Sequence, residues 1–226
     1  MTRPAGRTLG PAGGRGLGAD LVLATGSRGK RAELAELLAP HGLRLASPVE
    51  LGGIALPEEG DDYAENAVAK ARAAAAASGL PALGDDSGIE VAALGGAPGP
   101  RSARYGGPGL DDAGRSALLL RALAASGAAD RSARFVCVAA LAWPDGRVER
   151  ASGECRGRLL EAPRGGGGFG YDPIFQPVGH AASMAELPPA VTNRISHRAR
   201  ALAALAPAFG RLRAASRRAA RSAPRA

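Results

Sequence analysis

The fold class follows from residues 21–42, LVLATGSRGKRAELAELLAPHG. The first five residues are an apolar run of strand length, and GSRGK follows them as a tight turn. Leu34, Leu37 and Leu38 then recur at helical spacing until Gly42 ends the pattern. A strand, a tight loop and a helix in this order indicate an α/β domain.

The rest of the chain continues this alternation. Strands are predicted at residues 21–25, 43–47, 81–84, 89–94, 134–143 and 147–157, and helices at 65–79, 111–126 and about 196–209. The strand at 81–84 leads into DDSG, a sequence typical of an Asx turn. The strands at 134–143 and 147–157 are joined by a PDG turn as a long hairpin. These patterns predict an α/β domain with a mixed sheet and flanking helices.

Charge divides the chain into a body and two basic ends. The formal net charge is +8, but residues 1–19 hold three arginines and residues 187–226 hold nine, both without an acid. Removing these 12 charges leaves −4 for residues 20–186. We therefore predict a flexible basic leader at 1–19, a folded domain at 20–209 and an arginine-rich flexible tail at 210–226.

Other features exclude several protein classes. No uncharged apolar run approaches the roughly 18 residues of a membrane span, and the start lacks the apolar core of a secretory signal. Cys137 and Cys155 have neither zinc-site nor redox spacing. We expect a soluble cytoplasmic protein that requires no membrane and no specific nucleic acid.

The turn between the first strand and helix is a candidate anion site. Its backbone N–H groups, the hydroxyls of Thr25 and Ser27 and the charge of Lys30 suit a phosphate. It is not a Walker A loop, because Ala24 and Arg31 stand where that pattern needs glycine and Ser or Thr. The alternative is an ordinary turn in which Ser27 caps the helix.

Two acidic groups are candidate metal ligands. Glu58 and Glu59 lie in PEEGDD, and Asp85 and Asp86 lie in GDDSG. Carboxylates from separate segments bind Mg²⁺ when substrate phosphates complete its shell, and one of them could deprotonate a water. The alternatives are a solvated loop and an Asx turn.

The segment GGGGFGYDP, residues 165–173, is a candidate base-binding loop. Phe169 and Tyr171 are close together in a chain with only 4% aromatic residues, which favours a stacking platform. Ser196 is a predicted N-cap that leaves His197 and Arg198 in a first helical turn as donors. The alternatives are rings buried in the core and an ordinary surface pair.

Five segments together resemble the inosine/xanthosine triphosphate pyrophosphatase family. They are TGSRGK, EEGDDYAENAVAKA, GDDSGIEVAALGGAPGPRSARY, GGGGFGYDPIF and ISHR. The resemblance covers roughly residues 20–206. It implies two lobes around a nucleotide-binding cleft, Mg²⁺ as cofactor and a homodimer. It also implies hydrolysis of dITP, ITP and XTP to the monophosphate and pyrophosphate.

The resemblance also assigns site residues. Asp86 matches the catalytic proton acceptor and a metal ligand, and Glu58 matches the second metal ligand, with Glu59 as the alternative. The substrate-binding positions are Thr25, Gly26, Ser27, Arg28, Gly29, Lys30, Ser87, Phe169, Gly170, Tyr171, Asp172, Thr192, His197 and Arg198. Thr192 stands where the family has lysine. Asn66, Lys70 and Arg104 fall on characteristic positions without an assigned role.

Two rival functions stay open at this stage. A related pyrophosphatase for pyrimidine or other modified nucleotides would share the fold and chemistry. A non-enzymatic RNA-binding protein is supported by the arginine-rich ends alone. For the purine reading, fixed donors facing the 6-oxo group would reject adenine, but nothing in the sequence shows how the 2-amino group of guanine is excluded.

Overall fold

The structure is a computed structural model, and it describes residues 18–222. Residues 1–17 of the predicted leader and residues 223–226 of the predicted tail lie outside the described residues. Within this range, no helix is both long and apolar enough to cross a membrane.

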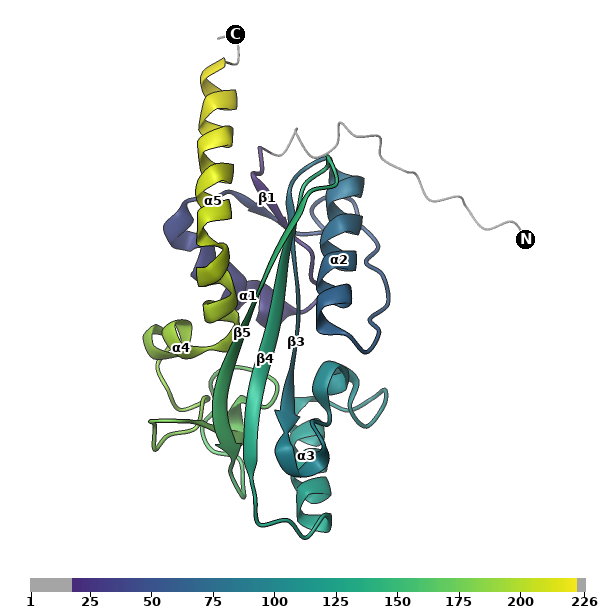
Figure 1. The fold of residues 1–226 in the computed structure, drawn as a ribbon, viewed down its shortest axis with the longest axis vertical. Helices are drawn as coiled ribbons and strands as arrows, with labels where there is room; N and C mark the ends of the chain where they lie inside the picture. The colour runs from purple at the N-terminus through teal and green to yellow at the C-terminus, as the bar shows by residue number, and fades with distance from the viewer. Residues whose placement is uncertain (1–17, 223–226) are drawn as a thin grey trace, which may run out of the picture.

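A mixed six-stranded sheet forms the centre of the molecule (Figure 1). Its strands are β1 (Leu21–Leu23), β2 (Leu45–Ala46), β3 (Ala82–Val91), β4 (Ser132–Ala142), β5 (Val148–Leu159) and β6 (Phe175–Pro177), in the order β2-β1-β3-β4-β5-β6. β1 is parallel to both β2 and β3, whereas the other neighbours are antiparallel. The predicted α/β class, mixed sheet and long hairpin are confirmed.

Five helices surround the sheet: α1 (Arg28–Leu38), α2 (Tyr63–Ser78), α3 (Asp112–Ala125), α4 (Pro189–Ile195) and α5 (His197–Ser222). Their starts follow local capping chemistry. Ser27 accepts from the Lys30 amide at 3.3 Å, and Ser196 accepts from the Ala199 amide at 3.0 Å. Both residues are therefore helix caps, as predicted.

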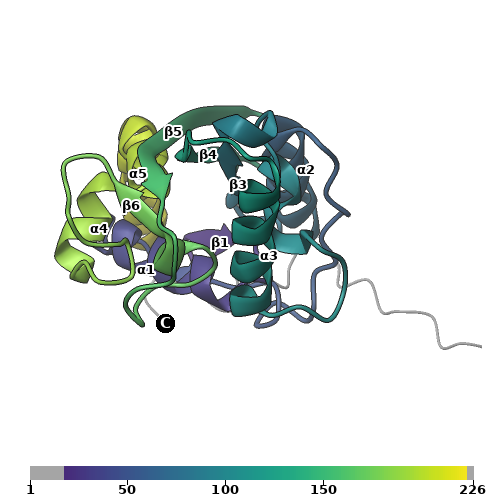
Figure 2. The same ribbon diagram turned by 90° about the horizontal axis from the view of Figure 1, so that it is seen from below.

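Three packed clusters define two lobes: the first lobe contains the two clusters on the faces of the sheet, and the second lobe contains the third cluster. α1 and α5 cover one face of the sheet around Leu83 and Cys137, and α2 covers the other face around Ala82 and Ala140. A third cluster lies toward the far ends of β3, β4 and β5, where Leu119 of α3 joins Ile89 and Phe175. Seen from below, α3 and the loops before α4 lie on opposite sides of a central space above α1 (Figure 2).

One sequence-based prediction about β3 is wrong. The DDSG segment is not a turn between two strands but the middle of one continuous strand. Asp85 is opposite Ala139 and Asp86 is opposite Val138 in the ladder with β4. Pairing along ten residues of a neighbouring strand outweighs the local turn preference, as tertiary context often does.

The predicted end of the last helix, near Phe209, is also wrong. α5 continues to Ser222, so residues 210–222 of the predicted tail are helical. Alanine, leucine and arginine are strong helix formers. Leu212 is buried at 5% exposure, which anchors the extension to the domain.

Both cysteines are buried free thiols. Cys137 is opposite Gly153 and Cys155 is opposite Phe135, so the two do not face each other across the hairpin. Burial raises the pKa of Cys137 to about 12, which keeps it an unreactive thiol.

Candidate active site

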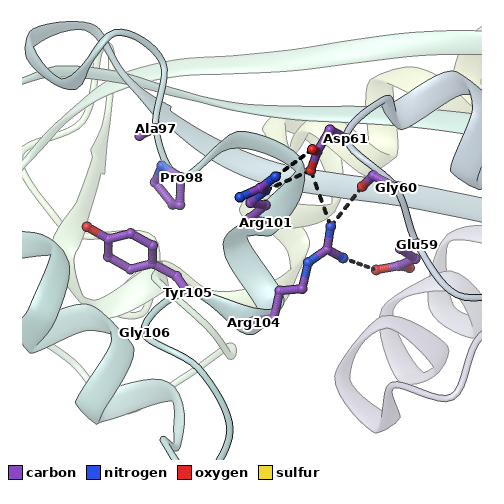
Figure 3. A pocket seen from close by; sticks show the side chains of 9 residues that line it. All are labelled: Glu59, Gly60, Asp61, Ala97, Pro98, Arg101, Arg104, Tyr105 and Gly106. Carbon is purple, nitrogen blue, oxygen red and sulfur yellow. Dashed lines mark hydrogen bonds and ion pairs between the residues drawn. The ribbon is translucent and has the colours of Figure 1, made fainter.

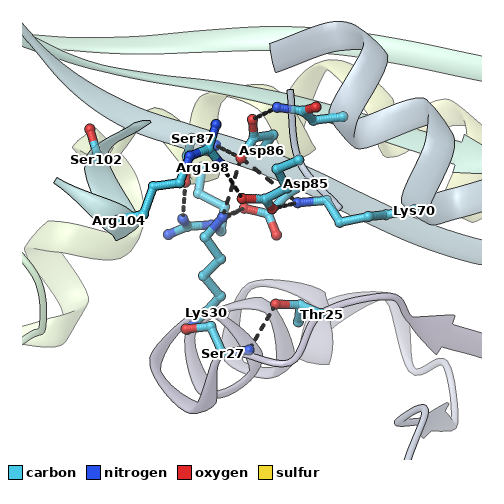
Figure 4. A network of polar contacts seen from close by, with 12 residues as sticks. Thr25, Ser27, Lys30, Lys70, Asp85, Asp86, Ser87, Ser102, Arg104 and Arg198 are labelled. Atoms are coloured by element: carbon cyan, nitrogen blue, oxygen red, sulfur yellow. Dashed lines mark hydrogen bonds and ion pairs between the residues drawn. The ribbon is translucent and has the colours of Figure 1, made fainter. Parts of the chain in front are cut away.

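The paired aspartates of β3 lie on opposite faces of the sheet, because side chains alternate along a strand. Asp85 shares the face covered by α5, and Asp86 shares the face covered by α2. β1 pairs with β3 only as far as Leu83, so the edge beyond it is open. Lys30 enters there and contacts both carboxylates, at 3.3 Å from Asp85 and 3.9 Å from Asp86 (Figure 4).

Asp85 is a buried anchor for Arg198. The carboxylate is fully buried and accepts from Nε of Arg198 at 3.1 Å. Burial alone would raise the pKa of Asp85, but Lys30 and Arg198 lower it below its ordinary value. Asp85 therefore stays ionised, and this ion pair fixes the start of α5 against β3.

Arg198 links three further groups to this anchor. It donates to Glu33 of α1, and its Nη2 donates to the Ser87 hydroxyl at 2.9 Å. Glu33 also accepts from Ser196 at 3.0 Å. The network holds α1, β3 and the start of α5 in one arrangement.

Asp86 has a different environment. Its Oδ2 accepts from Asn66 at 2.7 Å, and its Oδ1 lies 3.7 Å from Nζ of Lys70. Burial raises the pKa of Asp86 above its ordinary value, although Lys70 and Asn66 oppose the rise. A carboxylate with a raised pKa is a better proton acceptor than an exposed one.

The structure brings Glu59, the alternative metal ligand, to this cluster. It does not bring Glu58 there. Glu59 pairs with Lys70 and lies 3.7 Å from Nη1 of Arg104, whereas Glu58 is exposed. Arg104 also donates to the Gly60 carbonyl at 2.8 Å. Around a smaller cavity of about 650 Å³, Arg101 and Arg104 attach the acidic loop to the segment after β3 (Figure 3).

A cavity of about 960 Å³ lies between the lobes. It is lined by all fourteen substrate-binding residues predicted from the sequence: Thr25, Gly26, Ser27, Arg28, Gly29, Lys30, Ser87, Phe169, Gly170, Tyr171, Asp172, Thr192, His197 and Arg198. Glu59 lines it as well, and Asp86 is 1% exposed just behind Lys30 and Lys70. The structure therefore gathers segments that are far apart in the sequence.

The far end of the cavity is formed by the glycine-rich loop and the start of α5. Phe169 packs on Gly29, where an added Cβ would lie 2.7 Å from the ring. Tyr171 is only 5% exposed and donates to the Ser102 carbonyl at 2.8 Å, so it belongs to the core. Of the two rings, Phe169 is the one available to stack on a ligand.

Two titratable groups at this end have shifted pKa values. Asp172 accepts from the Phe169 amide at 3.0 Å, and burial raises its pKa to about 7. His197 stacks on Phe135 with ring centroids 4.8 Å apart, and burial together with Arg198 lowers its pKa. His197 is therefore neutral, and its buried Nδ1 has no hydrogen-bond partner among the described residues.

The carboxylates suit a hard divalent cation that is completed by its substrate. Among residues 18–222 no group of three or more His, Cys, Asp or Glu could hold a metal by itself. Mg²⁺ commonly uses only one or two carboxylates together with phosphates and water. Asp86 and Glu59, joined through Lys70, supply oxygen ligands of this kind.

Sequence reasoning missed Glu33, and it singled out Asn66 and Lys70 without giving them a role. Glu33 gave no motif signal, but it lies three residues after Lys30 and so shares its helix face. Asn66 and Lys70 belong to the rarest residue types in the chain, each type occurring only twice. That rarity was the signal available for their role at Asp86.

The comparisons with known proteins agree with this geometry. The model of the Ham1 family matches residues 21–208. The chain belongs to the Ham1 family. A relative from Rhodospirillum centenum, named dITP/XTP pyrophosphatase, is 54% identical over 186 residues, covering 80% of this chain and 90% of its own. One of the same name from Deinococcus radiodurans is 52% identical, covering 84% and 92%.

Solved Ham1 structures have the same fold. The HAM1 protein from Coxiella burnetii superposes with a TM-score of 0.76 at 43% identity, covering 84% of this chain and 97% of its own. The dITP/XTP pyrophosphatase from Mycobacterium abscessus superposes with a TM-score of 0.64 at 40% identity, covering 82% and 96%. The resemblance expected from the sequence is confirmed.

Proposed function

We propose that this chain hydrolyses dITP, ITP and XTP to the nucleoside monophosphate and pyrophosphate. The observation that carries the proposal is one cavity with two chemically distinct ends. Lysines, helix-start amides and carboxylates lie at one end, and the ring of Phe169 with a neutral histidine lies at the other. The names of the relatives fit this reading.

The triphosphate would occupy the end near α1. The amides at the start of this helix and the charge of Lys30 attract phosphate oxygens. Mg²⁺ held by Asp86 and Glu59 would add positive charge against the same oxygens. Lys70, now paired with Glu59, is a second cation for the pyrophosphate group.

Asp86 would accept the proton of the attacking water. The water oxygen bonds to the α-phosphorus, the bond from that phosphorus to the bridging oxygen breaks, and pyrophosphate leaves. Asn66 holds the carboxylate in place at 2.7 Å. A positioned base of this kind commonly contributes about 10²–10⁴-fold.

The base would stack on Phe169 beside His197. Hypoxanthine and xanthine present an acceptor at position 6, whereas adenine presents a donor. The N–H of neutral His197 and the second N–H of each terminal Arg198 nitrogen are the candidate donors to this acceptor. Adenine would leave them unpaired, an effect that can reach roughly 10⁴-fold.

Pyrophosphate release from ITP, XTP, dITP, GTP, ATP and dTTP tests the function. We expect the first three to be cleaved far faster, and equal turnover of all purines or orthophosphate as first product would refute the proposal. Fast dTTP cleavage would favour the pyrimidine rival. A homodimer, implied by the family resemblance, and a cytoplasmic location, expected from the composition of the sequence, complete the proposal, and sedimentation tests the dimer.

The metal ligands are tested with a matched pair. Glu59→Gln removes a carboxylate that lies against Lys70, and Glu58→Gln removes an exposed neighbour. We expect a higher Mg²⁺ requirement for turnover, and weaker Mn²⁺ binding by calorimetry, in the first variant only. The opposite result would assign the ligand to Glu58.

A further inference from the structure

Arg115 lines the cavity without a close partner. It lies in the first turn of α3, and its side chain is 17% exposed. Its Nε is buried and has no hydrogen-bond partner among the described residues. The nearest carboxylate, Asp112, is 3.8 Å from Nη1, which is longer than a hydrogen bond. A buried N–H of a charged group is thus left unsatisfied.

The other enclosed cations of the cavity are better paired. Lys30 lies 3.3 Å from Asp85, Lys70 contacts Glu59, and Arg198 donates to three acceptors. An unmade hydrogen bond from a buried donor is unfavourable, and a ligand acceptor would relieve it. Arg115 is therefore the cation with the most to gain from a ligand.

The position of Arg115 assigns it to the base-binding end. Two other residues of α3, one three positions before it and one directly after it, bind the glycine-rich loop. Asp112 accepts from the Gly170 amide at 2.8 Å, and the Ser116 hydroxyl donates to the Gly170 carbonyl at 3.4 Å. Gly170 directly follows Phe169, the aromatic ring proposed to stack on the base. Arg115 thus lies on the helix that holds this loop, and it lines the same cavity as Phe169.

We propose that Arg115 is a specificity-determining residue that recognises position 2 of the purine base. The inference rests on the proposed function. At this position xanthine has a carbonyl acceptor, hypoxanthine has only a C–H, and guanine has an amino donor. A guanidinium has donors only. It therefore favours xanthine, is neutral to hypoxanthine and opposes guanine, which explains how a 6-oxo purine such as GTP is excluded.

Three substitutions separate donation, acceptance and charge. Arg115→Met removes the donors, Arg115→Gln adds an acceptor for an amino group, and Arg115→Lys keeps the charge but removes the planar fork. Arg121→Gln is the control, because Arg121 is exposed on the same helix and does not line the cavity. Circular dichroism and thermal melting confirm folding of each variant.

The readouts are kcat/KM for XTP, ITP and GTP and the affinities for XMP, IMP and GMP. We expect Arg115→Met to lower the XTP-to-ITP ratio about tenfold or more, the value of one lost charged hydrogen bond. Arg115→Gln should raise the GTP-to-ITP ratio above that of Arg115→Met. Arg115→Lys should fall between wild type and Arg115→Met for XTP, and the control should match wild type.

The outcomes separate this inference from the proposed function. Unchanged ratios in folded variants, or an equal loss for all three bases, would overturn the role of Arg115. If the wild type releases no pyrophosphate, the proposed function fails. A shift in the ratio of XMP to IMP affinity would then still support recognition of position 2, and its absence would refute it.

Discussion

The two ends of the cavity differ in how far their polar groups are already paired. At the phosphate end, Lys30 and Lys70 each contact carboxylates in the ligand-free fold. At the base end, Nε of Arg115 and Nδ1 of His197 are buried without partners among the described residues. The lysines of one end are paired before the ligand arrives, whereas two buried nitrogen atoms of the other end are not.

This difference assigns separate tasks to the two ends. A triphosphate must compete with carboxylates for the lysines, and a divalent cation that occupies Asp86 and Glu59 would release Lys70 for phosphate. Arg115 and His197 at the base end meet no such competition, and their unpaired nitrogen atoms gain only from a base with matching groups. Binding strength would depend on the first end and discrimination between bases on the second.

Replacing Asp86 should have the largest effect on turnover. Asp86→Asn removes the proton acceptor and weakens a metal ligand, so turnover should fall by at least about 10²–10⁴-fold. The amide oxygen can still accept a hydrogen bond, so the fold should survive. ITP kinetics and thermal melting test this. A folded variant with normal turnover would contradict the role of Asp86.

Replacing Asp85 should act on the fold instead. Were DDSG a turn, Asp85→Asn would be mild, but the residue is fully buried against Arg198. Removing one partner of a buried ion pair commonly costs about 3–5 kcal/mol. Chemical denaturation should show a loss of this size. If Asp85→Asn is as stable as wild type, Arg198 has another anchor.

Burial of Asp172 at the base end should make the free energy of unfolding depend on pH. Its raised pKa, about 7, means that the folded state binds more protons than the unfolded state between about pH 4 and 7. Its contribution to stability therefore falls as pH rises through this window. Asp172→Asn stays neutral, so its stability relative to wild type should be higher at pH 8 than at pH 4.

Asp145 is a matched control, because its pKa is shifted in the opposite direction. Hydrogen bonds from Arg147 lower the pKa of exposed Asp145. Asp145→Asn should therefore lose a little stability at pH 8 relative to wild type and none at low pH. Denaturation of the Asp172 variant across pH 4–8, and of the Asp145 variant from pH 8 down to below its lowered pKa, decides the matter. A pH-independent difference for Asp172→Asn would show that this carboxyl is not protonated in the fold.

Replacing Thr192 should have the smallest effect, and we expect it in KM for ITP. Its hydroxyl already donates to the Pro189 carbonyl at 3.1 Å, and the residue lines the cavity. Thr192→Lys would add a cation at a site with an anionic ligand and should lower KM for ITP about tenfold if it gains a contact of roughly 1.4 kcal/mol. Arg194 is exposed and outside the lining, so Arg194→Ala should leave KM unchanged. An unchanged KM in Thr192→Lys would mean that position 192 does not face the substrate.

Much of this molecule was predictable from its sequence, because local patterns and rare residues coincide. Helical spacing and the Ser27 cap predict α1, and the only two lysines, Lys30 and Lys70, both lie in the carboxylate cluster. Asp85 was misjudged, because only pairing with β4 makes DDSG a strand. Arg115 was missed, because arginine is common in this chain and its isolation appears only in three dimensions.

The opposed placement of the two aspartates on β3 has a consequence for how this sequence tolerates insertions. One extra codon before Asp85 would exchange the faces of every later side chain in the strand. It would turn Asp85 toward α2 and Asp86 toward α5, and Arg198 would lose its anchor. Screening of single-codon insertions should therefore recover few active clones within residues 82–91 and many in the turn at 144–146. The positions at which this gene does not tolerate an insertion would therefore coincide with the strands of the sheet.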